Sequence, residues 1–111
     1  MSGHTFQPVL TLAEVGTGRM RSCRLGEREL VICHTRDGVF AVENVCTHAF
    51  ARMSEGYLKG NRIICPLHGA TFDVRTGQVL GGPAIAPLTA YQTKVVDGVV
   101  EVAAPIEAGG A

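Results

Sequence analysis

The chain lacks tryptophan, and aromatic residues make up only 5% of its 111 residues. Valine, isoleucine, leucine and alanine must therefore supply most of the packing within an apolar content of 46%. A charge bias is also missing, because ten Lys and Arg residues balance ten Asp and Glu residues. A balanced chain gives no electrostatic argument for nucleic acid or an anionic membrane as a partner, so we expect neither.

Long apolar runs are absent as well. No segment approaches the roughly 18–20 apolar residues needed to span a bilayer. The first residues, Met1-Ser2-Gly3-His4-Thr5, show no basic segment followed by an apolar stretch, so no signal peptide is expected. These features predict a cytoplasmic monomer. The length predicts a single domain over residues 1–111, with a frayed tail at residues 105–111.

Four cysteines in a chain without an export signal do not indicate a disulfide framework. Cys23 and Cys33 lie in strand-like stretches with no Cys or His partner at ligand spacing, so we expect them to be buried as small apolar residues. We expect His4 to be solvated and His34 to lie at a strand end. A solvated face, with partner docking as the alternative, is expected for the charged residues Arg19, Arg21, Arg24, Glu27, Arg28 and Glu29.

Short apolar runs separated by Asp-Gly, Gly and Pro residues are typical of an all-β domain. The apolar run at residues 30–33 is short enough for a strand buried on both faces. Two Asp-Gly pairs, Asp37-Gly38 and Asp97-Gly98, each separate two apolar runs, which predicts two hairpins with both turn residues at positive φ. Between the hairpins, many Gly and Pro residues predict a loop-rich middle. Short helical turns are expected only at residues 12–15 and 53–55.

That middle segment contains two short motifs, Cys46-Thr47-His48 and Cys65-Pro66-Leu67-His68-Gly69, with sixteen residues between them. Two Cys and two His could bind one tetrahedral metal ion. Structural zinc sites, however, commonly use Cys-x₂₋₄-Cys and His-x₃₋₅-His pairs, which Cys-x-His matches poorly. The order of residues suits a two-iron cluster better, in which each loop gives one ligand to each iron.

The motifs and their surroundings resemble the Rieske-type ferredoxins of bacterial aromatic-ring dioxygenase systems, and the resemblance covers nearly the whole chain. Its fold would be a Rieske-type antiparallel β-sandwich with two cluster-binding loops at one tip, at about residues 44–53 and 63–73. The segments that carry the resemblance are 44–49, 54–56, 58–61, 65–73, 76–77 and 83–84, together with both Asp-Gly hairpins.

The resemblance implies one Rieske-type [2Fe-2S] cluster, with Cys46 and Cys65 on the inner iron and His48 and His68 on the outer iron. It also implies a one-electron carrier between a flavin-containing reductase and a terminal aromatic-ring oxygenase, and no catalytic activity of the chain itself. Two alternatives stay open: a Rieske subunit of a larger redox complex, and a structural Cys₂His₂ zinc module.

Respiratory Rieske proteins differ in ways that bear on the reduction potential. They carry a Ser and a Tyr whose hydroxyls donate to the cluster sulfurs, where this chain has Ala70 and Phe72. Fewer donors destabilise the reduced cluster, so we expect a potential low in the Rieske range of about −150 to +300 mV. Docking is expected at the tip around the two histidines, with an apolar patch of Ala49, Phe50, Leu67 and Pro83.

Overall fold

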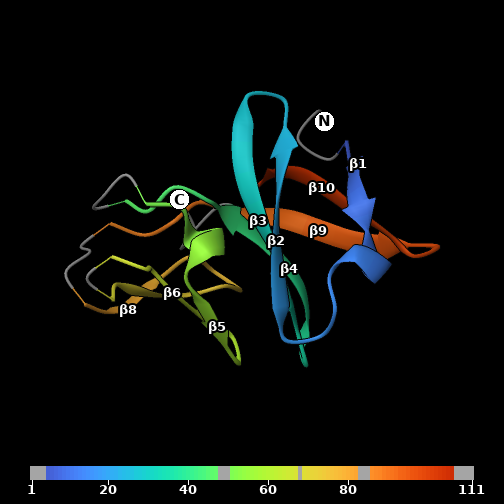
Figure 1. Ribbon diagram of the computed structural model, residues 1–111. Helices are drawn as coiled ribbons and strands as arrows, with labels where there is room; N and C mark the ends of the chain where they lie inside the picture. The colour runs from blue at the N-terminus through green and yellow to red at the C-terminus, as the bar shows by residue number, and fades with distance from the viewer. Residues whose placement is uncertain (1–4, 48–50, 68, 83–85, 107–111) are drawn as a thin grey trace.

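Two antiparallel β-sheets form the part of the chain that the structure describes (Figure 1). This computed structural model describes residues 5–47, 51–67, 69–82 and 86–106. Its elements, in chain order, are β1 (Gln7–Thr11), the 3₁₀ turn η2 (Leu12–Glu14), β2 (Arg19–Leu25), β3 (Arg28–Thr35), β4 (Gly38–Glu43), the 3₁₀ turn η3 (Met53–Glu55), β5 (Tyr57–Lys59), β6 (Arg62–Ile64), β7 (Thr71–Asp73), β8 (Val79–Gly81), β9 (Ala90–Val96) and β10 (Val99–Pro105). The expected all-β sandwich class and both short helical turns are confirmed.

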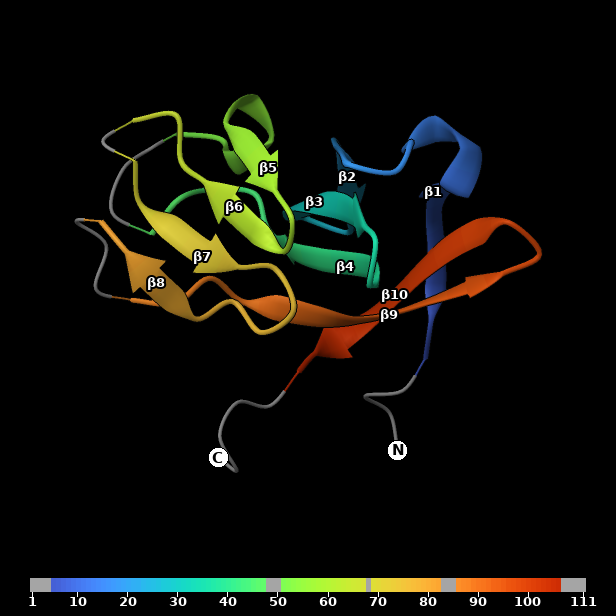
Figure 2. The ribbon, with the colours of Figure 1, turned by 90° about the horizontal axis from the view of Figure 1, so that it is seen from below.

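The larger sheet has the strand order β1-β10-β9-β4-β3-β2, and the smaller one has the order β5-β6-β7-β8. In Figure 2 the four short strands of the smaller sheet lie to one side of β3 and β4, while the β9–β10 hairpin extends away from them. The whole smaller sheet is inserted in the sequence between β4 and β9. It therefore carries the segment that contains both candidate motifs.

Strand β3 contributes to two separate apolar cores. Val31 and Cys33 pack with residues of the smaller sheet, including Ile63 and Phe72. Leu30 and Ile32 instead pack on the opposite face, against other residues of the larger sheet. Every residue from 30 to 33 is fully buried, which confirms the strand predicted to be buried on both faces. Burial of a side chain such as Phe72 contributes about 1.5–3 kcal/mol to stability.

The two predicted hairpins both form, but their turns differ. Val96 pairs with Val99, and the loop residues Asp97 and Gly98 have φ values of 51° and 78°, as expected for this turn. In the first hairpin Thr35 pairs with Gly38, so the loop is Arg36-Asp37 and not Asp37-Gly38. Asp97 alone has a positive φ among the described residues other than glycine. The prediction for Asp37 was therefore wrong, because the Thr35 hydroxyl accepts the Asp37 N–H at 3.1 Å and favours a different turn.

Two further expectations need correction. The middle segment is not only loops, since four strands of three residues each pair there as β5 to β8. Such short strands, bounded by glycines, leave no alternating pattern to detect in the sequence. The frayed tail predicted at residues 105–111 does not include Pro105 or Ile106, because Pro105 ends β10 and the Ile106 N–H donates to the Ala90 carbonyl at 2.7 Å. Residues 107–111 lie outside the described ranges.

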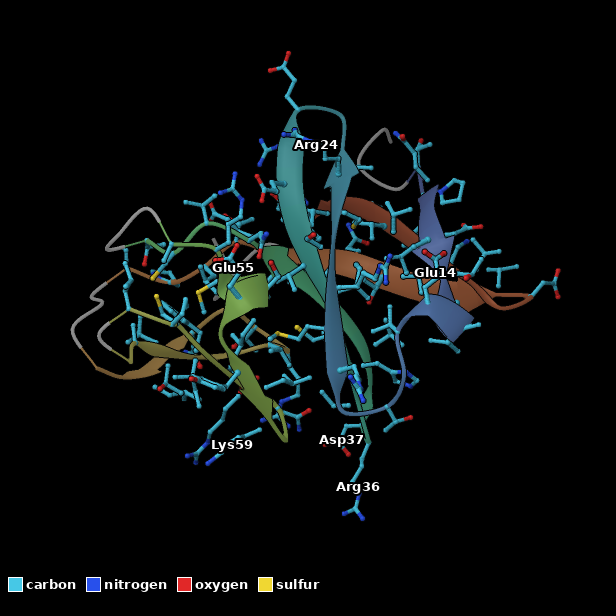
Figure 3. The ribbon with its side chains drawn as sticks, viewed as in Figure 1. Glu14, Arg24, Arg36, Asp37, Glu55 and Lys59 are labelled. Carbon is cyan, nitrogen blue, oxygen red and sulfur yellow. The ribbon has the colours of Figure 1, made fainter. Side chains whose placement is uncertain are left out.

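Charged side chains lie around the edges of both sheets (Figure 3). Arg24 is at the β2–β3 end of the larger sheet, whereas Arg36 and Asp37 are at the opposite end of β3. Within the described residues, no helix is long and apolar enough to cross a membrane.

Candidate metal centre

Each candidate cysteine begins a loop that is closed by the same kind of hydrogen bond. The Cys46 N–H donates to the Ala51 carbonyl at 2.9 Å, and the Cys65 N–H donates to the Ala70 carbonyl at 2.8 Å. In both loops donor and acceptor are five positions apart. The sequence places His48 in the first loop and His68 in the second, and both histidines lie outside the described residues.

The two candidate thiols lie beside each other in the interior, although they come from different loops. Cys46 is 4% exposed and Cys65 is 1% exposed. Burial raises the pKa of the Cys65 thiol, the Leu67 N–H lowers it in part, and the adjacent Cys46 thiol raises it further. A bound metal would compensate the charge of the thiolate that Cys65 must become to act as a ligand.

The surroundings of these thiols fit a metal–sulfur group. The backbone N–H of Leu67 interacts with the Cys65 sulfur, as expected for a group that stabilises a thiolate ligand. Gly69 has a φ of 73°, and a Cβ atom placed on it would meet no atom of the described residues within 4 Å. This left-handed conformation favours glycine, and the missing side chain lets the backbone approach a ligand closely. The described residues therefore supply half of the expected ligand set in a suitable environment.

Asn44 fixes the base of the first loop, which the sequence analysis did not predict. The residue is completely buried. Its Oδ1 accepts the Ser54 N–H at 2.8 Å, and its backbone carbonyl accepts the Met53 N–H at 2.6 Å. Val45 and Arg52 pair beside it as an isolated bridge. A polar residue two positions before Cys46 was the available signal, but its partners are not evident from the sequence.

Two glycines hold the second loop from either side. A Cβ atom on Gly56 would collide with the Ile64 carbonyl and lie 3.1 Å from Cδ of Pro66. A Cβ atom on Gly82 would lie 2.6 Å from Cα of Ala70. The second loop is thus packed against backbone on both sides, and only glycine allows this approach.

Of the two remaining cysteines, Cys33 is buried as predicted, whereas Cys23 on β2 is only partly buried. Cys33 is fully buried, and burial raises the pKa of its thiol to about 12. Cys23 is half-buried, and burial raises the pKa of its thiol to about 11. His34 lies near the end of β3, where its Nδ1 is 2.7 Å from the Val15 carbonyl oxygen, so it has a structural contact. His4 lies outside the described residues.

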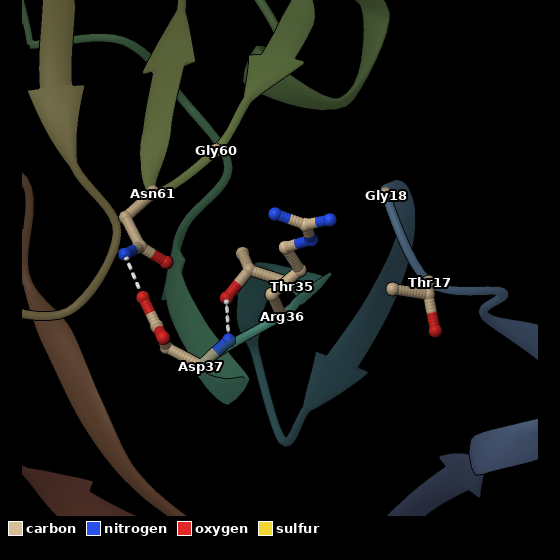
Figure 4. Close-up of a pocket in the computed structure, with 7 residues that line it drawn as sticks. All are labelled: Thr17, Gly18, Thr35, Arg36, Asp37, Gly60 and Asn61. Carbon is tan, nitrogen blue, oxygen red and sulfur yellow. Dashed lines mark hydrogen bonds between the residues drawn. The ribbon is translucent and has the colours of Figure 1, made fainter.

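A cavity of about 470 Å³ lies between three turns, at Thr17-Gly18, Thr35–Asp37 and Gly60-Asn61 (Figure 4). Asn61 Nδ2 donates to Asp37 Oδ2 at 2.6 Å across it. No cysteine or histidine lines this cavity, so it is separate from the candidate metal centre. Within the described ranges no three metal-binding side chains come together, and two of the four predicted ligands lie outside those ranges.

The family of the chain follows from this fold and its two loops. The Rieske [2Fe-2S] domain family matches residues 5–92, which include both motifs. The chain belongs to this family.

Several characterised proteins are similar to it. The ferredoxin component of the naphthalene 1,2-dioxygenase system of Pseudomonas putida is 36% identical over 86 residues, which cover 78% of this chain and 83% of that protein. The ferredoxin of carbazole 1,9a-dioxygenase from Nocardioides aromaticivorans IC177 superposes with a TM-score of 0.85 at 32% identity, covering 90% of this chain and 98% of that one. A chain from the complex of reduced oxygenase and oxidized ferredoxin in carbazole 1,9a-dioxygenase superposes with a TM-score of 0.84 at 33% identity. The match covers 94% of this chain and 97% of that one.

Family membership gives this chain one Rieske-type [2Fe-2S] cluster as its cofactor. Its chemistry is the transfer of single electrons, and it is a carrier rather than a catalytic enzyme.

Proposed function

We propose that this chain is the ferredoxin of an aromatic-ring dioxygenase system in aromatic hydrocarbon catabolism. It takes single electrons from a flavin-containing reductase and passes them to a terminal oxygenase. The observation that carries the proposal is the pair of adjacent, buried thiols on two equally closed loops, within a domain whose relatives are dioxygenase ferredoxins.

The cluster ligands in this proposal are Cys46 and Cys65 for the inner iron and His48 and His68 for the outer iron. Their spacing in the sequence supports all four, and the burial of the two thiols supports the inner pair. When bound, the cluster accepts and releases one electron. The chain's own part is to keep water from the thiolates, to donate the Leu67 N–H to the Cys65 sulfur, and to hold the two loops at a fixed separation.

The remaining proposals concern the organisation of the molecule. Residues 1–111 form a single Rieske domain, with cluster-binding loops at about residues 44–53 and 63–73. The carrier acts as a monomer in the cytoplasm, where a reducing environment keeps the two ligand thiols available to iron. The partner docks at the tip formed by the two loops, and a small interface, near or below about 1,200 Å², suits fast release.

Metal analysis and reconstitution test the proposal. Purified protein should hold about two irons and two acid-labile sulfides per chain and give a rhombic EPR signal once reduced. It should also support electron flow from an NAD(P)H-dependent flavoprotein reductase to an aromatic-ring oxygenase. A colourless protein with one zinc ion would contradict the proposal and indicate the zinc module instead. A cluster that transfers electrons only within a stable larger assembly would indicate a Rieske subunit.

Single substitutions test the ligand set. Cys46→Ser and Cys65→Ser should each abolish cluster assembly and destabilise the fold, because metal binding is coupled to folding. His48→Ala and His68→Ala should remove the Rieske spectrum. Cys23→Ser is the control, since this half-buried thiol lies outside both loops and its replacement should leave the iron content unchanged. Retention of the native EPR signal in any of the four ligand variants would remove that residue from the ligand set.

A further inference from the structure

The carboxylate of Glu29, on β3, lies between two side chains of the first loop. Its Oε2 accepts from Asn44 Nδ2 at 2.9 Å and from Arg52 Nε at 2.6 Å. Its Oε1 accepts from Arg52 Nη2 at 3.3 Å. The backbone carbonyl of Glu29 also accepts the Asn44 N–H at 2.9 Å. Glu29 is therefore more than part of the solvated charged face that the sequence predicts.

The two partners of Glu29 stand at the two ends of the loop. Asn44 follows the last residue of β4, and Arg52 precedes η3. Val45 and Arg52 pair with each other, and inside this bridge the Cys46 N–H is bound to the Ala51 carbonyl. One carboxylate on β3, a strand that pairs with both β2 and β4, thus joins the start and the end of the loop that begins with Cys46.

The charge of Glu29 is held close to this loop as half of an ion pair. Its side chain is 20% exposed, whereas that of Arg52 is 54% exposed. The hydrogen bond from Arg52, followed by the one from Asn44, lowers the pKa of Glu29, so the carboxylate is ionised at neutral pH. Arg24 and Glu55 are the other charged groups that act on this pair. Removal of the charge of Glu29 or of Arg52 would therefore leave the other charge uncompensated next to the loop.

We propose that Glu29 is a positioning residue of the cluster, which holds both ends of the loop at residues 44–53 and balances the charge of Arg52 beside it. This inference rests on the proposed cluster function. It makes two separate predictions, one for the backbone of the loop and one for the reduction potential.

The backbone prediction is tested by amide exchange in the purified protein and does not depend on the potential. In Glu29→Ala the loop ends lose their common acceptor, so the amide protons of Cys46, Met53 and Ser54 should exchange faster than in the purified wild-type protein. We expect an increase of about tenfold, which corresponds to about 1.4 kcal/mol in local opening free energy. Glu29→Gln keeps an acceptor for Asn44 and should show a smaller increase. Unchanged exchange at all three amides in Glu29→Ala would overturn the positioning role.

The reduction potential of the cluster distinguishes an effect of charge from an effect of loop packing. Reduction adds negative charge to the cluster, so Glu29→Gln, which leaves Arg52 unpaired, should raise the potential. Arg52→Gln leaves Glu29 unpaired and should lower it. The double variant should return toward the wild-type value, and all shifts should shrink as ionic strength rises. A merely structural role would instead shift both single variants in the same direction or shift neither.

Glu101→Gln is the matched control. Glu101 forms an ion pair with Lys94 on β9 and β10, and the two side chains are 23% and 49% exposed, nearly as in the Glu29–Arg52 pair. Ala90 of β9 pairs with Val42, near the first loop. Lys94 lies four residues further along β9, which is roughly 13 Å from Ala90 at the spacing of a β-strand. Glu101→Gln should leave the reduction potential and the amide exchange of the first loop unchanged. An equal shift in this control, or shifts of one sign in both Glu29→Gln and Arg52→Gln, would overturn the charge-balancing role.

The failure of this inference is distinguishable from failure of the proposed function. A wild-type protein purified without iron and sulfide would contradict the cluster, whereas amide exchange in that same purified protein would still decide whether Glu29 holds the loop. A normal wild-type cluster with unresponsive variants would contradict only the role of Glu29.

Discussion

Gly82 lies directly against Ala70, so that a Cβ atom on Gly82 would come within 2.6 Å of the Ala70 Cα. Gly82 also has a φ of 84°, a conformation that favours glycine. Ala70 is the residue whose carbonyl closes the second loop by accepting the Cys65 N–H. The contact therefore fixes the closing residue of the second loop against the backbone that follows β8.

Gly82→Ala should loosen the second loop and reduce the retention of iron. Its cost combines left-handed backbone strain of about 1–2 kcal/mol with the displacement of Ala70. Gly18→Ala is the control, because Gly18 has nearly the same φ of 83° but no atom within 4 Å of its Cβ position. We expect urea unfolding to show a larger loss for Gly82→Ala, and chelator challenge to remove iron faster from that variant alone. Equal losses in both would mean that the contact with Ala70 has no effect on the loop.

Local sequence patterns predicted the parts of the fold that depend on local chemistry. The Asp97-Gly98 turn formed as expected because both residues tolerate positive φ, and the buried run at residues 30–33 became β3. Asp37-Gly38 has the same letters, yet the Thr35 hydroxyl captures the Asp37 N–H and the turn moves by one residue. A side chain outside the two-residue signal decided that case.

The candidate site was predictable only as a list of ligands. The sequence order of Cys46 and Cys65 allowed two loops to be proposed, but not the contacts that hold them in place. Asn44 and Glu29 are fifteen residues apart, and the contact of Gly82 with Ala70 joins two short strands that carry no periodic pattern. Such packing between distant segments depends on the whole fold and leaves no local signal.

Substitution of Leu67 can test the predicted docking surface. Leu67 is 48% exposed, and its backbone N–H, which a substitution retains, interacts with the Cys65 sulfur. Ala49, Phe50 and Pro83, the other residues of the predicted patch, lie outside the described residues. Leu67→Asp should slow electron transfer to the oxygenase several-fold without changing the visible spectrum, because it places a charge on an apolar contact. Val96→Asp is the control, as Val96 is 41% exposed at the far β9–β10 turn. Normal transfer by Leu67→Asp would place docking elsewhere.

Cys33 should make the protein less stable in alkali. Burial raises the pKa of its thiol to about 12, whereas the thiol of an unfolded chain has a pKa of about 8.5. The stability that comes from keeping this thiol neutral is therefore complete below about pH 8.5 and is lost as the pH rises toward the folded pKa. Between pH 7.5 and 10 this one group should cost about 1–2 kcal/mol.

Cys33→Ala removes the titrating group, so its free energy of unfolding should fall less over the same pH range than that of the wild type. Urea titrations of both proteins at pH 7.5 and 10 give the comparison. A small loss at pH 7.5 from the removed sulfur does not affect the difference between the two pH values. Parallel losses in both proteins would mean that Cys33 does not contribute to the alkaline instability.

Ala70 and Phe72 should contribute to a low reduction potential. Both side chains are fully buried in the core that also contains Cys46 and Cys65, and neither offers a hydrogen-bond donor. Ala70→Ser and Phe72→Tyr would each place a hydroxyl in this dry region, where the sulfurs of the cluster are the acceptors that the resemblance indicates.

A hydrogen bond to a charged group contributes about 1.5–3 kcal/mol, and only its difference between the two oxidation states changes the potential. Since about 1.4 kcal/mol corresponds to about 59 mV in a one-electron couple, each variant should raise the potential by some tens of millivolts. The double variant should exceed either single one, and should still accept electrons from the reductase while passing them on less readily. Voltammetry of the three variants checks this, and unchanged or lower potentials would show that cluster charge and exposure set the value instead.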